Sequence, residues 1–128
     1  MTPEIALVWP ELKAAGPYPP AAYAFVQDGL RHTCDRLVEH DRESLGMGRH
    51  VSGQELCMGI RDLAIDRFGD LARTVLDVWN IRRTNDFGNI VFALVDAGLL
   101  RKTEEDAVED FADVFDFDEA FSPTMSAI

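Results

Sequence analysis

The spacing of apolar residues constrains the fold of this chain more than any other feature of the sequence. They recur every three to four positions in successive segments that glycines separate, which places them on one face of an α-helix. The first long segment carries Tyr23, Val26 and Leu30, and it predicts an amphipathic helix from Ala21 to Glu43. A chain of 128 residues is long enough for one hydrophobic core. The sequence therefore predicts a single, mainly α-helical domain.

Capping signals predict shorter helices in the rest of the chain. Ser52 followed by Glu55 forms a capping-box pattern at the start of a second helix, and Gly69 ends it. Two more helices are expected, the first capped by Asp70 and the second capped by Thr84 and ended by Gly98. The sequence thus predicts three helices after residue 51.

This order of elements resembles a winged-helix module, in which a trihelical core leads into a small two-stranded wing. Leu99 and Leu100, directly after Gly98, are expected to begin a strand or an extended turn. The spacing within the segment from Phe111 to Phe117 fits either a strand or a helix. We therefore expect a trihelical core preceded by the long helix, winged-helix-like, with a small C-terminal β-ribbon. A helical bundle with a terminal hairpin would produce the same pattern.

The ends of the chain differ in composition from this domain. Residues 1–19 hold four of the six prolines, and a fifth follows at Pro20. The run from Pro17 to Pro20 is expected to be stiff and extended. We interpret residues 1–19 as a proline-rich arm, either ordered or loose, and residues 20–121 as the domain. Residues 122–128 are expected to form a mobile tail.

Charge is distributed unevenly along the chain. The 23 acids and 12 bases give a net charge of −11. Residues 31–83 carry nine arginines and nine acids, whereas residues 84–128 carry eleven acids and two bases. An excess of acid disfavours general binding to nucleic acid or anionic lipid. The arginines of the balanced region are expected to pair with acids on the same or neighbouring helices.

The N-terminus and the cysteines favour a cytoplasmic protein. Glu4 stands where a secretory leader would carry bases, and the longest apolar run is too short to cross a membrane. Cys34 and Cys57 fall in separate predicted helices without the spacing of metal ligands. We expect free, buried thiols, no metal and no cofactor.

Several motifs together resemble a family of small uncharacterised bacterial proteins of planctomycete and verrucomicrobial type. The resemblance spans residues 18 to 121 and rests on four segments, RHVSGQEL (49–56), IRRTNDFGNIVF (81–92), KTEED (102–106) and DFDEAF (116–121). It implies a bacterial intracellular protein of one domain and carries no catalytic assignment.

The acidic and aromatic C-terminal third is the main candidate for function. Phenylalanines there lie next to acids, so that each apolar anchor has a charge beside it that would attract a basic partner. The alternative is that the rings only cover the core while the acids stay solvated. We predict a non-catalytic interaction or regulatory module that binds a basic protein through Glu104, Glu105, Asp106, Asp110, Asp113, Phe115 and Phe117.

Two other functions remain open from the sequence. A nucleic-acid-associated regulator would use Arg82, Arg83 and Asn85 at the start of the fourth helix, although acids surround them. A small hydrolase-type enzyme would need a histidine and carboxylate site at His32 or His50, and no nucleophile is recognisable beside either.

Self-association also remains open. Some apolar residues lie off the main helical stripes and form a second patch that a homodimer would cover. They are Phe25, Val38, Met58 and Phe92.

Overall fold

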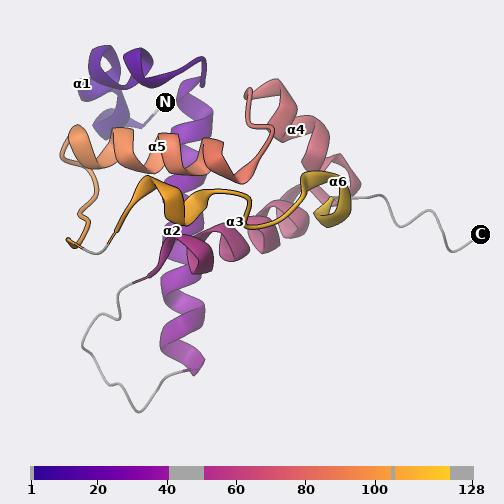
Figure 1. The fold of residues 1–128 in the computed structure, drawn as a ribbon. Coiled ribbons are helices and arrows are strands. Elements are labelled where there is room, and N and C mark those ends of the chain that lie inside the picture. Colours follow the sequence, from indigo (N-terminus) through magenta and orange to yellow (C-terminus); the bar gives the residue numbers. More distant parts are fainter. Residues whose placement is uncertain (1, 41–50, 105, 122–128) are drawn as a thin grey trace, which may run out of the picture.

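A computed structural model describes residues 2–40, 51–104 and 106–121 (Figure 1). The longer helices are α1 (Pro3–Leu12), α2 (Pro20–His40), α3 (Gly53–Phe68), α4 (Ala72–Val78) and α5 (Thr84–Asp96). The 3₁₀ turns are η1 (Lys13–Ala15), η3 (Gly69–Leu71) and η4 (Val108–Phe111), and a last turn of helix forms α6 (Phe117–Ala120). Helices α3 and α5 both pack on the long α2. The predicted mainly α-helical fold is confirmed.

The N-terminal arm contains a helix. Thr2 caps α1, its hydroxyl accepting a hydrogen bond from the Ile5 N–H at 3.3 Å, and Pro3 occupies the first turn, where proline is tolerated. Ile5 and Leu12 are fully buried, and the Tyr23 hydroxyl donates to the Leu12 carbonyl at 2.8 Å. Residues 2–15 therefore form helical structure that packs on the body through Ile5 and Leu12, and the stretch between them and Pro20 is extended.

Helices α2 and α3 confirm the strongest local signals. Helix α2 matches the predicted long helix as far as His40, and residues 41–43 lie outside the described ranges. At the start of α3, the Glu55 N–H donates to Ser52 Oγ and the Ser52 N–H donates to Glu55 Oε1, both at 3.1 Å. Gly69 ends α3 at φ +54°, a conformation that favours glycine.

A glycine also explains how closely α2 and α3 approach. A Cβ on Gly59 would lie 1.8 Å from the Thr33 hydroxyl oxygen of α2. Only a residue without a side chain lets the two backbones pack at this distance.

The predicted cap of the third helix is wrong. Helix α4 begins after η3, its N-cap residue is Leu71, and no side chain caps it. Asp70 lies within the preceding 3₁₀ turn and is exposed. The turn at Gly69 places Asp70 too early to cap the helix, and α4 is shorter than expected.

The winged-helix expectation is not supported. Gly98 ends α5 at φ +84°, and the Leu99 and Leu100 N–H groups donate to the Leu94 carbonyl at 2.9 and 3.3 Å. Together with the bond from the Gly98 N–H to the Val95 carbonyl at 3.0 Å, this is a Schellman-type helix end. Leu99 and Leu100 therefore complete the end of α5 and do not open a strand.

The C-terminal β-ribbon is likewise not supported, because the described ranges contain no strand. The segment from Phe111 to Phe117 runs from the end of η4 through turns to the start of α6. Figure 1 shows this chain passing along α5 and reaching α6 near the ends of α3 and α4. The expected tail, residues 122–128, lies outside the described ranges.

The residues predicted for a second apolar patch differ in exposure. Phe25 is buried and packs on Phe68 and Trp79, with ring centroids 5.6 and 5.4 Å away. Phe92 is half-buried, Met58 is 37% exposed, and the side chain of Val38 is not described.

No helix in the described ranges has both the length and the apolar character needed to cross a membrane.

Ion pairs join the helices of the balanced region. Arg67 of α3 pairs with Asp28 of α2 at 3.0 Å, and Asp62 of α3 accepts hydrogen bonds from Arg36 and Arg61. Burial opposes ionisation of Asp62, but the two guanidinium groups outweigh it and lower the pKa of this carboxyl. These contacts agree with the expected pairing of arginines with acids on neighbouring helices.

Candidate functional site

Aromatic side chains fix the acidic segment, which we define as residues 106–121, to the helical body. Phe111, Phe117 and Phe121 are buried. The ring centroids of Phe117 and of Phe87 in α5 are 5.7 Å apart. The half-buried Phe115 stacks on Phe117, with a centroid distance of 5.5 Å. Because the rings are held in the core, the irregular backbone between them has a defined position.

Thr84 also anchors this segment. Its hydroxyl donates to the Phe111 carbonyl at 2.6 Å and accepts from the Val114 N–H at 3.0 Å, and the residue is fully buried. The predicted helix-capping role of Thr84 is wrong, since it is the first residue of α5 and follows the N-cap Arg83. Its hydroxyl instead substitutes for the backbone hydrogen bonds that an irregular segment lacks.

The predicted interaction residues have different positions in the structure. Glu104 and Asp113 are exposed, and Glu105 lies outside the described ranges. The half-buried pair Asp106 and Asp110 accept hydrogen bonds from the backbone N–H groups of Thr103 and Ala107, at 2.8 and 3.1 Å. Phe115 is half-buried and Phe117 buried. Further exposed acids, which the prediction did not include, lie on the same segment at Glu109, Asp116, Asp118 and Glu119.

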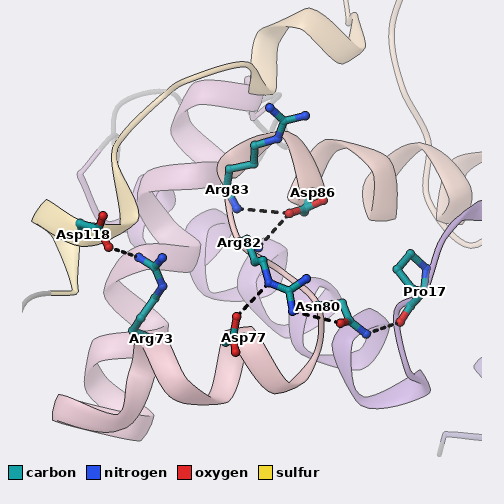
Figure 2. A network of polar contacts seen from close by, with 8 residues as sticks. All are labelled: Pro17, Arg73, Asp77, Asn80, Arg82, Arg83, Asp86 and Asp118. Atoms are coloured by element: carbon teal, nitrogen blue, oxygen red, sulfur yellow. Dashed lines mark hydrogen bonds and ion pairs between the residues drawn. The ribbon is translucent and has the colours of Figure 1, made fainter.

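An arginine of the protein itself docks on the acidic segment. The Arg73 guanidinium of α4 pairs with the Asp118 carboxylate at 2.7 Å (Figure 2). It also lies over the Phe117 ring, 5.5 Å from its centroid. The Asp118 side chain is 85% exposed. The site therefore combines a ring face with a carboxylate, and a guanidinium group fits both.

The residues of the nucleic-acid alternative lie close to this site. Arg82 donates to the Asp77 carboxylate at 2.9 Å and to Asn80 at 3.4 Å, and the Asn85 amide oxygen accepts from the Asp113 N–H at 3.4 Å. Figure 2 shows the Arg83 guanidinium pointing away from Arg82. A hollow of about 400 Å³ brings these arginines together with acids of the acidic segment, its charged lining being Arg73, Arg82, Arg83, Asp113, Asp116 and Asp118.

Asp86 has a structural role that sequence reasoning missed. Its carboxylate accepts from the Arg82 and Arg83 N–H groups at 2.8 and 3.2 Å and from the Tyr18 hydroxyl at 2.6 Å. Burial is the main cause that raises the pKa of Tyr18 to about 12; the hydrogen bond from Asn89 opposes it, and the hydrogen bond to Asp86 and the charge of Asp86 add to it. The position of Asp86, three residues after the N-cap, was a signal for its contact with the backbone N–H groups at the start of α5. No signal in the sequence indicated its contact with the Tyr18 hydroxyl.

The enzyme alternative gains no assembled site from the described residues. His32 is half-buried on α2, the side chain of His40 is not described, and His50 lies outside the described ranges. Within those ranges, no three His, Cys, Asp or Glu side chains gather as metal ligands would. Cys57 is a buried free thiol, and burial raises its pKa to about 12; Cys34 is free and half-buried.

Comparison with family models, curated proteins and solved structures finds no match.

Proposed function

We propose that the protein is a non-catalytic interaction module whose acidic segment binds a basic protein partner through arginine side chains. The single observation that carries the proposal is the docking of Arg73 on Phe117 and Asp118. That contact supports the proposal because a guanidinium group lies against a ring and a carboxylate, the two residue types that alternate along the segment.

The rigidity of the segment supports a role in binding. The two hydrogen bonds of Thr84 and the buried rings hold the backbone in place before any partner arrives. A surface that is already ordered loses less conformational entropy on association. The exposed carboxylates of Asp113, Asp116 and Glu119 are therefore presented from a fixed backbone.

The pairing of rings with acids favours arginine over lysine in the partner. The planar guanidinium stacks on an aromatic face and donates to a carboxylate at the same time, whereas an ammonium is a strongly hydrated point charge. Phe115 is only half-buried and lies between Asp113 and Asp116 in the sequence. This part of the segment offers the partner the same combination that Arg73 finds at Phe117.

The same geometry weakens the nucleic-acid alternative. The hollow that contains Arg82 and Arg83 is also lined by Asp113, Asp116 and Asp118. A phosphate entering it would face carboxylates, and Arg82 is already paired with Asp77. Useful affinity for a polyanion at physiological salt needs several uncompensated cations.

Fluorescence anisotropy with a labelled arginine-rich peptide tests the proposal. The triple variant Asp113→Asn, Asp116→Asn and Glu119→Gln should weaken binding about tenfold, since exposed ion pairs contribute modestly and additively. Asparagine tolerates the positive φ of +50° at residue 113, so the fold should be kept. A lysine-rich peptide of equal charge should bind more weakly than the arginine peptide.

A matched control removes the same charge elsewhere, through Glu4→Gln, Glu11→Gln and Asp66→Asn at exposed positions of α1 and α3. An equal loss of affinity in both triple variants would mean general charge attraction and would refute a specific surface. Salt-sensitive binding of duplex DNA that collapses in the Arg82→Ala, Arg83→Ala variant would instead establish the nucleic-acid alternative.

A further inference from the structure

A cavity of about 450 Å³ lies between the middle of α2, the start of α3 and the end of α5. Its size falls within the range of small-molecule sites, roughly 300–1,000 Å³. The interior is mainly apolar, with side chains from three helices and the turn after α5; these include Leu30, Leu56, Val91, Phe92, Val95 and Leu100.

Cations lie at one side of this cavity. Arg101 and Lys102 line it, both are exposed, and they are the only two bases in residues 84–128. Neither forms an ion pair within the described residues, although Asp106 and Asp110 line the same cavity. Those two carboxylates accept hydrogen bonds from the backbone of their own turns.

The start of α3, where the Glu55 carboxylate accepts from the Ser52 N–H, also lines the cavity. Ser52 and Gly53 are lining residues, and the sixteen-residue helix that follows them directs the positive end of its dipole to this point. Arg101 and Lys102 are the only bases in residues 84–128, a region with eleven acids, and they line this apolar cavity together with Asp106 and Asp110. Both features together match a ligand with an aliphatic body and an anionic head.

We infer that this cavity binds a carboxylate-bearing aliphatic amphiphile, with the chain among the side chains of α2, α3 and α5 and the carboxylate between Arg101 and Lys102. The inference is independent of the acidic segment's binding to a basic partner. It is carried by the volume, the apolar lining and the placement of the only two C-terminal bases.

Isothermal titration calorimetry with monomeric decanoate, below its micellar concentration, tests the site. Decanoate should bind at least tenfold more tightly than decanol, and decyltrimethylammonium should bind more weakly than either. Lengthening the chain from octanoate to decanoate should tighten binding about fourfold for each methylene that is buried.

Charge variants separate the head-group contact from the apolar contact. Arg101→Gln with Lys102→Gln should weaken decanoate about tenfold and leave decanol unchanged. The matched control, Lys13→Gln with Arg83→Gln, removes two exposed cations outside the cavity and should leave both ligands unchanged. These surface substitutions do not depend on repacking the core.

A second readout uses Cys34, which lines the cavity, whereas Cys57 is fully buried. Saturating decanoate should slow alkylation of Cys34 several-fold, and Val95→Trp, which fills the cavity, should abolish binding of both ligands. The inference would be overturned by equal affinity for decanoate and decanol, or by Arg101 and Lys102 substitutions that leave decanoate binding unchanged. It would also be overturned if the protein bound anionic vesicles but not monomeric decanoate.

Discussion

In the α2–α3 pair, acidic side chains face arginines across the helix interface, as Asp62 does with Arg36 and Asp28 with Arg67. In the acidic segment, phenylalanines and Thr84 hold the backbone, and most acids are exposed. The packing of α2 against α3 brings these acids and bases together, whereas the acidic segment pairs with an arginine at Asp118. Acids of the first region therefore join two helices, whereas several acids of the second, such as Asp113 and Glu119, are exposed on a backbone that other residues hold.

The largest effect is expected from removing the central anchor of the acidic segment. Phe117→Ala deletes a buried ring that contacts Phe87 and should lower the free energy of unfolding by about 3–5 kcal/mol. Phe115→Ala removes a half-buried ring and should cost about 1–2 kcal/mol. Urea denaturation of both variants measures this difference. Equal costs would show that the two rings do not divide into an anchor and a surface residue.

The second prediction concerns the hydrogen bonds of Thr84. Thr84→Val keeps the shape but removes the partner of the Phe111 carbonyl and of the Val114 N–H, and should cost about 2–3 kcal/mol. Thr33→Val is a matched control, because this buried hydroxyl donates only to the Gly29 carbonyl of its own helix at 2.7 Å. It should cost less than about 1 kcal/mol in the same urea experiment. If the control costs as much, burial and not anchoring explains the effect.

The third prediction tests Asp86, an acid of the C-terminal region that is used inside the fold. The ordinary tyrosine pKa is 10.0 and that of Tyr18 is about 12. Its contribution to stability is therefore complete below pH 10.0 and declines as the pH rises toward about 12. Ultraviolet titration should show tyrosinate at higher pH in the native than in the unfolded protein.

Asp86→Asn should lower the native pKa of Tyr18, because it removes the carboxylate charge that disfavours tyrosinate. The protein has only two tyrosines. The pKa of the other, Tyr23, is raised by burial and not by Asp86, so the substitution should shift the titration of Tyr18 alone. An unchanged titration curve in this variant would mean that burial alone sets the pKa of Tyr18.

The smallest effect is expected in the α2–α3 pair. Asp62→Asn should cost about 0.5–1 kcal/mol at neutral pH, since both partners are partly exposed. The pKa of Asp62 is lowered from 3.8, so its contribution is present above that pH and is lost as the pH falls through the lower native value. Denaturation curves of variant and wild type should converge in acid. Asp66→Asn, an exposed acid of the same helix, is the control and should change stability little at either pH.

Much of the fold was predictable, since helix limits depend on neighbouring residues. The Ser52–Glu55 capping box and the glycine ends at Gly69 and Gly98 are confirmed because each acts within about one turn of helix. Of the strand or extended turn predicted at Leu99, the strand is wrong for a related reason. Its N–H completes the end of α5, and the Schellman pattern continues past the glycine that was interpreted as the boundary.

The candidate site was predictable only in part. The concentration of acids and phenylalanines is visible in the sequence, but it does not tell a buried Phe117 from a half-buried Phe115. The contact of Arg73 with Asp118 joins residues 45 positions apart. Spacing rules for helices do not reach that far, and only the packing of α4 beside α6 brings them together.

The sequence by itself determined that this chain is helical, where several helices begin and end, and where its negative charge is concentrated, because periodicity, capping and charge are properties of neighbouring residues. Only the tertiary structure decided that Thr84 anchors a distant segment, that Asp86 joins the N-terminal arm to α5, and that Arg101 and Lys102 border an apolar cavity. Those roles depend on which distant side chains meet when the core forms, and that is set by the packing of the whole chain.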